Sequence, residues 1–308
     1  NRYNTREARK GSMQQRAIGV GIQGLSDIFY KLEIEYESLE AIALVSKLEE
    51  AIHYYTIKGS MEYSKKVGKR LFEEETIYPI ENGVFQWEKY GVETHLDWET
   101  LRQDILTYGV ANSMFNAQMP TATSAQMHSS TESYETLTNN IYVRRLKIGE
   151  VTVINRFLVR AFEKLGIWGE DLSDDLILAG GSVQDLNIYD YLDIPTKEQK
   201  AKFEKIQAIF KTTWEVSQKT RTNICIAMQP FIDQAISMNV FYKAPTISRW
   251  SSALFYAWRN NLKTGNYYCR TYKETGNKSL GISKKDSFSE MINKSRNSDP
   301  DDCEMCSS

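Results

Sequence analysis

Three hydroxyl-bearing side chains stand in a short run of small residues near the middle of the chain. The run is Pro120, Thr121, Ala122, Thr123 and Ser124, and it lies between a strand-like segment at 113–118 and a helix-compatible stretch. Small side chains let a ligand approach the backbone, and the first free N–H groups of a helix attract an anion. The run therefore predicts a phosphate-binding loop, although the same composition also forms plain helix caps.

Two adjacent tyrosines, Tyr267 and Tyr268, form a second pattern in a strand-like segment at 267–272. The phenol group is both redox-active and acidic, so a stacked pair could relay an electron and a proton. Ordinary aromatic packing in a sheet is the alternative. Neighbouring residues of a regular strand point to opposite faces, so we expect one ring to be buried and the other exposed.

A Cys-x-x-Cys pair, Cys303 and Cys306, lies at the end of the sequence. No second cysteine or histidine pair lies nearby, and His53, His95 and His128 are scattered, so we predict no metal site. A vicinal pair on a tether suits thiol–disulfide exchange, in which one thiolate attacks a disulfide and its neighbour resolves the mixed disulfide. The alternative is two free thiols without a role.

The elements that must position these groups alternate along the chain. Apolar spacing predicts helices at 41–55, at 98–105 with Asp97 as cap and Gly109 as end, at 203–218 and at 250–262. Strand-like runs lie at 84–87, 141–143, 151–154, 239–242 and 267–272. Helices interleaved with strands favour an α/β fold. Cys225 falls in a helix-like run, 222–228, and is interpreted as a core thiol.

Composition restricts the class of protein. The 308 residues carry 38 basic and 40 acidic side chains, a net charge of −2, which offers no general field for DNA. No apolar run approaches the roughly 18 residues of a membrane span, so we expect no membrane association. Four cysteines favour a reducing compartment, and we expect a cytoplasmic protein. The polar stretch 273–308 predicts a mobile tail after a structured body, 1–272.

Seven stretches, in order, resemble the C-terminal part of the large, catalytic subunit of class I ribonucleotide reductase of the eukaryotic or viral type. They are RAIGVGIQGL at 16–25, MPTATSAQ at 119–126, NIYVRR at 140–145, WEVSQKT at 214–220, FIDQ at 231–234, LKTGNYY at 262–268 and CEMC at 303–306. Any one of them could arise by chance, but the ordered set could not. The resemblance covers nearly the whole chain.

The resemblance implies an oxidoreductase that reduces ribonucleoside diphosphates to deoxyribonucleoside diphosphates, for DNA replication, by a radical mechanism. In that family the Pro-Thr-rich loop holds the substrate diphosphate, which assigns Pro120 to Ser124 that role. The tandem tyrosines end the radical-transfer route from the small subunit, and the tail cysteines re-reduce the active-site disulfide before passing oxidising equivalents to thioredoxin or glutaredoxin. The implied fold is the second half of a ten-stranded α/β barrel with a small α/β domain and the tail.

Two departures from the family pattern stand out in the matching stretches. Thr123 and Ser124 stand in the order opposite to the usual Ser-Thr, with both hydroxyls retained. Cys269 occupies a position where the family more often has an apolar residue, and we assign it no role.

Other family features match nothing in this sequence: the thiyl-radical cysteine, the two redox-active cysteines and the effector sites. We expect them upstream, in an N-terminal portion that acts as a partner. The chain begins at Asn1 without a methionine, so we expect a split subunit or a fragment that does not turn over unaided. We expect no cofactor in this chain, with nucleotide effectors (ATP or deoxynucleotides) and the small subunit's metal radical centre elsewhere in the complex.

Two alternatives belong to other function classes. A non-catalytic paralogue or fragment could act as a binding module for the small subunit, but binding alone needs neither the tyrosine pair nor the tail cysteines. A stand-alone thiol oxidoreductase using Cys303 and Cys306 is disfavoured, because such enzymes mount the motif at a helix N-terminus.

Overall fold

The structure is a computed structural model that describes residues 2–69, 79–146 and 149–272, and its contacts divide the chain into two compact units. Unit 1 comprises Asn1–Gly24, Glu37–Tyr134 and Ser217–Arg270. Unit 2 comprises Leu25–Tyr36, Glu135–Val216 and the described residues from Thr271. The loop at 120–124 and the tyrosine pair at 267–268 therefore belong to the same unit. The predicted tail, 273–308, lies outside the described residues.

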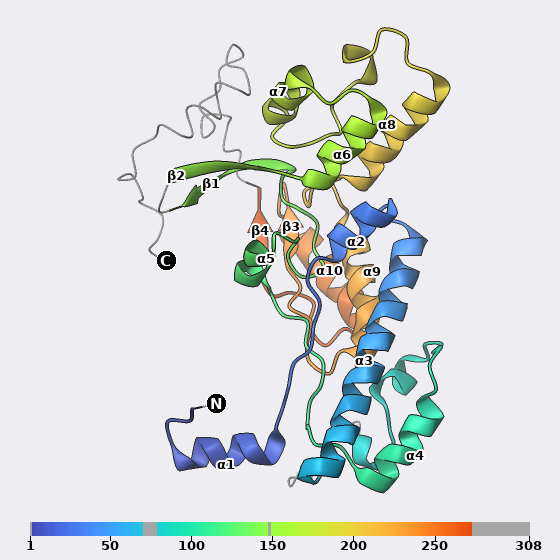
Figure 1. Ribbon diagram of the computed structural model, residues 1–308, viewed down its shortest axis with the longest axis vertical. Helices are drawn as coiled ribbons and strands as arrows, with labels where there is room; N and C mark the ends of the chain where they lie inside the picture. Colours follow the sequence, from blue (N-terminus) through green and yellow to red (C-terminus); the bar gives the residue numbers. More distant parts are fainter. Residues whose placement is uncertain (1, 70–78, 147–148, 273–308) are drawn as a thin grey trace. The chain divides into compact units, whose positions relative to one another are not determined.

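Unit 1 is built mainly of helices (Figure 1). They are α1 (Arg6–Gln15), α3 (Leu39–Val67), α4 (Trp98–Tyr108), α5 (Ala122–His128), α9 (Gln218–Met228) and α10 (Ile247–Arg259), with short 3₁₀ turns η1 (Ile80–Asn82), η2 (Gln86–Tyr90) and η4 (Gln229–Phe231). The long helix α3 packs against α9 and α4, and α9 in turn packs against α10. This framework carries the loop and the tyrosine pair.

In its described residues, unit 2 combines four helices with a β-hairpin. The helices are α2 (Leu25–Leu32), α6 (Arg156–Leu165), α7 (Glu170–Leu178) and α8 (Lys197–Ile209), with a 3₁₀ turn η3 (Ile188–Asp190). The hairpin pairs β1 (Ile141–Leu146) with β2 (Gly149–Ile154) in antiparallel register, with Ile141 opposite Ile154. The predicted strands at 141–143 and 151–154 are confirmed.

A second two-stranded sheet joins β3 (Val240–Tyr242) to β4 (Cys269–Thr271). It confirms the strands predicted at 239–242 and, in its central part, at 267–272. The strand-like segment at 113–118 forms a single parallel bridge, between Asn116 and Val20. Gly21 makes this approach possible, because a Cβ atom there would lie 2.1 Å from the carbonyl oxygen of Ala117.

Helix α3 begins two residues before the predicted apolar face and runs twelve residues beyond it. The hydroxyl of Ser38 caps its N-terminus by accepting a hydrogen bond from the N–H of Ala41 at 3.0 Å. The buried face continues through Tyr54, Ile57 and Met61 to the last turn. Tyr55, which the sequence spacing places on the apolar face, is instead 61% exposed, because its neighbour Tyr54 takes the inward position.

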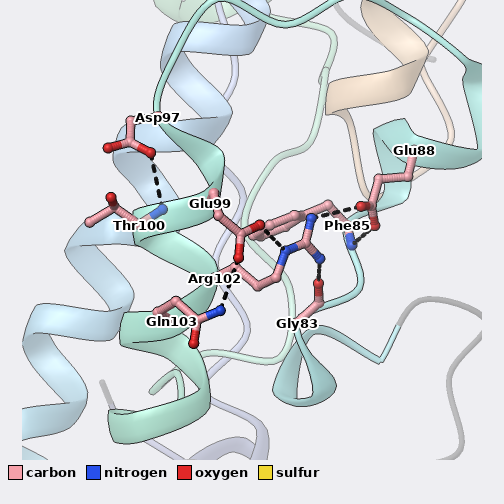
Figure 2. A network of polar contacts seen from close by, with 8 residues as sticks. All are labelled: Gly83, Phe85, Glu88, Asp97, Glu99, Thr100, Arg102 and Gln103. Atoms are coloured by element: carbon pink, nitrogen blue, oxygen red, sulfur yellow. Dashed lines mark hydrogen bonds and ion pairs between the residues drawn. The ribbon is translucent and has the colours of Figure 1, made fainter.

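The strand predicted at 84–87 is wrong, because side chains of α4 hold this segment in turns (Figure 2). Arg102 donates to the carbonyl oxygen of Gly83 and forms ion pairs with Glu88 at 2.7 Å and Glu99 at 3.0 Å. The Glu88 carboxylate also accepts from the N–H of Phe85 at 2.8 Å. The predicted start of α4 is confirmed, since Asp97 accepts from the N–H of Thr100 at 3.0 Å, and the helix ends before Gly109.

The helix predicted at 203–218 ends earlier, at Ile209. After it, the N–H of Thr213 donates to the carbonyl oxygen of Leu137 at 2.7 Å, and the N–H of Thr212 donates to the Glu215 carboxylate at 2.7 Å. These bonds draw the backbone out of the helix, so Trp214 lies in a connecting turn. A new helix, α9, starts after Ser217, whose hydroxyl accepts from the N–H of Thr220 at 3.0 Å.

Each unit has its own apolar core. Phe85, Trp98, Ile57 and Phe231 are among the core residues of unit 1, and Phe162, Leu176 and Phe203 are among those of unit 2. Burying one side chain of this size contributes about 1.5–3 kcal/mol. Within the part of the chain that the structure describes, no helix combines the length and apolar character needed to cross a membrane.

Candidate functional site

The predicted phosphate loop lies at the surface of unit 1, at the start of the short helix α5. Pro120, Ala122, Thr123 and Ser124 are exposed, whereas Ala125, the next residue, is fully buried and anchors the turn. The hydroxyl of Ser124 donates to Oε1 of Gln23 at 2.9 Å. The loop thus offers backbone and hydroxyl groups to solvent on a fixed base.

Thr121 has a different position from the other hydroxyl residues of the loop. Its Oγ1 accepts a hydrogen bond from the N–H of Ser133 at 2.7 Å, which closes the segment 121–133 on itself. The side chain of Gln118, just upstream, donates to the carbonyl oxygen of Ile22 at 2.9 Å and accepts from the N–H of Ile22 at 3.1 Å. Thr121 therefore holds the loop in shape, whereas Thr123 and Ser124 are exposed, with the Ser124 hydroxyl bonded to Gln23.

The tyrosine pair does not follow the strand alternation predicted for it. Both rings are about half exposed, 46% for Tyr267 and 52% for Tyr268, and their centroids lie only 4.3 Å apart with an interplanar angle of 58°. The expectation of one buried and one exposed ring is wrong, because both residues precede β4 and are not part of a regular strand. Hydrogen bonding with Tyr268 raises the pKa of Tyr267.

The segment 236–240 forms backbone hydrogen bonds with Gln118, two residues before the loop, and with the tyrosine pair. The N–H of Ser237 donates to the carbonyl oxygen of Gln118 at 3.1 Å, and the N–H of Tyr267 donates to that of Met238 at 2.6 Å. The N–H of Val240 donates to the carbonyl oxygen of Tyr268 at 2.8 Å. Backbone hydrogen bonds on both sides therefore place the two predicted site segments in one continuous framework.

Asp233 and Lys263 connect the segments of this framework by hydrogen bonds, and neither residue was predicted from the sequence to have a role. The Asp233 carboxylate accepts from the N–H groups of Phe115 and Asn116, at 2.6 and 2.8 Å, in the segment that leads to the loop. The ammonium group of Lys263 donates to Oε1 of Gln86 at 2.5 Å and to the carbonyl oxygen of Asp233. Burial lowers the pKa of Lys263 to about 8, partly opposed by the charge of Asp233. Asp233 lies in the FIDQ stretch and Lys263 in the LKTGNYY stretch. Their place in these family motifs is the feature of the sequence that could have identified them.

Two buried titratable groups of α3 lie next to this network. Burial lowers the pKa of His53, whose Nδ1 lies 2.9 Å from Oδ1 of Asn116. Glu49, one turn earlier, is fully buried, and burial raises its pKa to about 8. Neither oxygen of the Glu49 carboxylate has a hydrogen-bond partner among the described residues. At neutral pH this side chain is therefore protonated.

The cysteines separate into three groups. Cys225 is fully buried in α9, as predicted for a core thiol, and Cys269 is exposed in β4 beside the tyrosine pair. Cys303 and Cys306 lie outside the described residues. Within the described ranges, no three His, Cys, Asp or Glu side chains gather in a group that could hold a metal ion.

Comparison with known families and proteins gives one consistent set of matches. The family model described as "Ribonucleotide reductase, barrel domain" matches residues 1–268. The chain is 37% identical over 273 residues to the ribonucleoside-diphosphate reductase large chain 2 of Saccharomyces cerevisiae, covering 88% of this chain and 30% of that protein. It is 36% identical over 310 residues to the large chain of Encephalitozoon cuniculi, covering 100% of this chain and 38% of that protein.

A viral protein and a solved structure match in the same way. The large subunit of variola virus is 36% identical over 273 residues, which are 88% of this chain and 33% of that protein. The structure of the Actinobacillus ureae class Id ribonucleotide reductase alpha subunit superposes with a TM-score of 0.64 at 21% identity, over 86% of this chain and 41% of that chain. The chain thus spans about a third of the length of the curated relatives that it matches.

Proposed function

Because the chain belongs to the ribonucleotide reductase barrel-domain family, we propose that it supplies part of the large subunit of a ribonucleoside-diphosphate reductase. The family match and the mixed helix and strand content confirm the predicted α/β fold class, part of the reductase barrel. In the proposed reaction a ribonucleoside diphosphate loses its 2′-hydroxyl as water and gains hydrogen at that carbon. A dithiol supplies the two electrons and becomes a disulfide.

The observation that carries this proposal is the geometry of the tyrosine pair. Two half-exposed phenol rings 4.3 Å apart give poor hydrophobic burial but a short path for an electron. Half-exposed rings gain only part of the stabilisation that full burial in the core would provide. The hydrogen bond between the phenols adds a route for the proton that must accompany the electron. This arrangement supports a radical relay at Tyr267 and Tyr268.

The exposed loop supports the proposed substrate site. Thr123 and Ser124 present hydroxyls next to open backbone, and Thr121 and Gln118 hold the turn from behind. Hydrogen bonds to an anionic phosphate contribute about 1.5–3 kcal/mol each. We therefore assign the diphosphate of the substrate to Pro120–Ser124, with Thr123 and Ser124 as its direct hydroxyl partners.

The helix that precedes the tyrosines carries a face suited to the small, radical-generating subunit. Phe255 and Trp258 of α10 are 61% and 70% exposed, and Ala257 is the one residue of this helix that is fully buried. A Cβ atom at Gly265 would lie 3.0 Å from the side chain of Leu254 and 3.1 Å from that of Ala257, so the loop that carries the tyrosines approaches α10 closely. A subunit that delivers a radical to Tyr268 must dock close by, and the aromatic face of α10 is our proposed contact.

The thiol shuttle and the upstream partner complete the proposal. Cys303 and Cys306 would reduce the disulfide formed in each turnover and then be reduced by thioredoxin or glutaredoxin. The hydrogen-abstracting cysteine would come from an N-terminal portion of the large subunit.

Reconstitution tests the whole proposal. The chain, an N-terminal portion that carries the missing cysteines, and a small subunit should reduce a ribonucleoside diphosphate only when all three are present. Turnover that does not depend on this chain would overturn the proposed function.

A further inference from the structure

Unit 2 has a groove of about 470 Å³ between α2, α6 and α8. Its floor is apolar and includes Tyr30, Phe157, Ile206 and Phe210. The ring of Tyr30 stacks on that of Phe210, with centroids 4.8 Å apart. A groove of this size holds a small ligand or a few residues of a peptide.

The rim of the groove is strongly cationic. Five basic side chains line it, Lys31, Arg160, Lys164, Lys202 and Lys205, against one carboxylate, that of Glu33. Glu33 lies 3.2 Å from the Lys205 ammonium and 3.9 Å from that of Lys164. Glu198, on the outer side of α8, pairs with Lys202 at 2.7 Å. An excess of positive charge remains over an apolar floor, which is the pattern that selects an anionic partner with some apolar surface.

The sequence of this chain contains a segment with the complementary pattern. Asp299, Asp301, Asp302 and Glu304 place four negative charges within six residues, and Met305 follows them as an apolar side chain. Methionine adapts to irregular apolar surfaces such as the groove floor. We propose that the groove of unit 2 binds this acidic segment, residues 299–305, of the same chain.

The length of chain permits this contact. The ring of Tyr272, the last described residue, contacts that of Trp214 with centroids 5.2 Å apart. Trp214 is four residues beyond Phe210 of the groove floor, a span of at most about 14 Å. The 27 residues from Tyr272 to Asp299 can span up to about 90 Å. Attachment to the same chain also keeps the acidic segment at a high effective concentration near the groove.

The contact deepens the proposed function, on which its consequence rests. The acidic residues surround Cys303, so a docked segment would hold the thiol pair on the surface of unit 2. There a protein reductant could reach the disulfide form. The docking itself requires only opposite charges and can be measured without any catalysis.

Carbodiimide cross-linking of the full chain tests the docking. The reagent condenses a carboxylate with a neighbouring amine, and peptide mass spectrometry locates the product. We expect cross-links from residues 299–304 to Lys31, Lys164, Lys202 and Lys205 at low salt. They should disappear at 1 M salt, where the screening length falls to about 3 Å. Cross-links spread evenly over all exposed lysines would overturn the proposal.

A pair of variants on one helix provides the matched control. Lys202→Glu with Lys205→Glu should reduce cross-linking to the remaining groove lysines, Lys31 and Lys164, to the level of a lysine outside the groove. Lys197→Glu with Lys200→Glu makes the same charge change on α8 outside the groove lining and should leave the cross-links intact. Circular dichroism shows whether each variant is folded. Arg160→Ser gives a second, milder test if the double variant loses its fold.

The inference and the proposed function fail in distinguishable ways. If groove cross-links are absent while Cys303→Ser with Cys306→Ser still abolishes thioredoxin-driven turnover, the docking is wrong and the thiol shuttle stands. If the cross-links are present while that double variant is fully active, the docking stands and the shuttle is wrong.

Discussion

The phenol rings of Tyr267 and Tyr268 lie 4.3 Å apart, although neighbouring residues of a regular strand point to opposite faces. Backbone hydrogen bonds fix both residues against 238–240, so the pair is held in place while both rings stay half exposed. The pair is thus positioned by its backbone rather than by burial of its rings, and this relationship leads to the first prediction.

Replacing Tyr268 by Phe should abolish turnover in the reconstituted complex while leaving stability almost unchanged. Phe keeps nearly all of the aromatic volume but cannot form a phenoxyl radical, and a half-exposed ring adds little to the core. Activity assays and thermal unfolding of Tyr268→Phe and Tyr267→Phe check this. Full activity in either variant would show that the pair contributes only ordinary aromatic packing.

The hydroxyls of the loop should contribute to substrate affinity. Thr123→Val combined with Ser124→Ala removes two donors to the diphosphate, each worth about 1.5–3 kcal/mol, and should raise the KM or Kd for the nucleoside diphosphate. Gln23→Ala is the matched control, because it removes the Ser124 partner and leaves both hydroxyls in place. Unchanged affinity of the double variant for the nucleoside diphosphate would show that the loop is not part of the substrate site.

The tail cysteines should be needed only for repeated turnover. With Cys303→Ser and Cys306→Ser, thioredoxin-driven or glutaredoxin-driven turnover should stop, whereas a pre-reduced complex should still complete one turnover. Dithiothreitol is small enough to reach the active-site disulfide directly and should restore part of the rate. Misfolding would lower both rates equally, and a normal rate with thioredoxin would show that the cysteines are not used.

The aromatic face of α10 should control assembly with the small subunit. Trp258→Ala removes a ring that is 70% exposed, so the fold of unit 1 should persist while affinity for the small subunit falls. Equilibrium binding by surface plasmon resonance measures this, with Tyr55→Ala, a similarly exposed ring on α3, as control. Equal affinity of wild type and Trp258→Ala would place the contact elsewhere.

Glu49 should make the stability of the chain fall as pH rises. Its pKa is raised from the ordinary value of 4.5 to about 8, so the stability present below pH 4.5 is lost as pH rises towards 8. Glu49→Gln removes this dependence and should be more stable than wild type at pH 8. A gain of about 2 kcal/mol would raise the Tm by roughly 4–8 °C.

Glu50, the next residue, is the control, because its pKa is shifted in the opposite direction. Although burial acts to raise the pKa of Glu50, hydrogen bonds from His95, Trp98 and Leu96 lower it below its ordinary value. Its contribution is therefore present above the unfolded pKa and lost as pH falls through the folded value. Glu50→Gln should lower the Tm at neutral pH, and thermal unfolding at several pH values compares the two variants. A Glu49→Gln curve parallel to wild type would contradict the assignment.

The sequence by itself determined the family and the approximate positions of many helices and strands. The order of the motifs along the chain indicates family membership, because motifs can be recognised in a sequence without knowledge of the structure. The cap at Asp97 and the stop at Gly109 act within one helical turn, so they could be predicted correctly from neighbouring residues. The buried position of Cys225 agrees with its interpretation as a core thiol in a helix-like run.

Tertiary structure decided what depends on residues distant in the sequence. The turns at 84–87 exist because Arg102 reaches back to them, and the helix at 197–209 ends where Thr213 bonds to Leu137. Asp233 and Lys263 join segments more than a hundred residues apart, which no local pattern encodes. The tyrosine pair remained ambiguous in the sequence for the same reason, because its backbone is held by hydrogen bonds to Met238 and Val240, which are distant in the sequence.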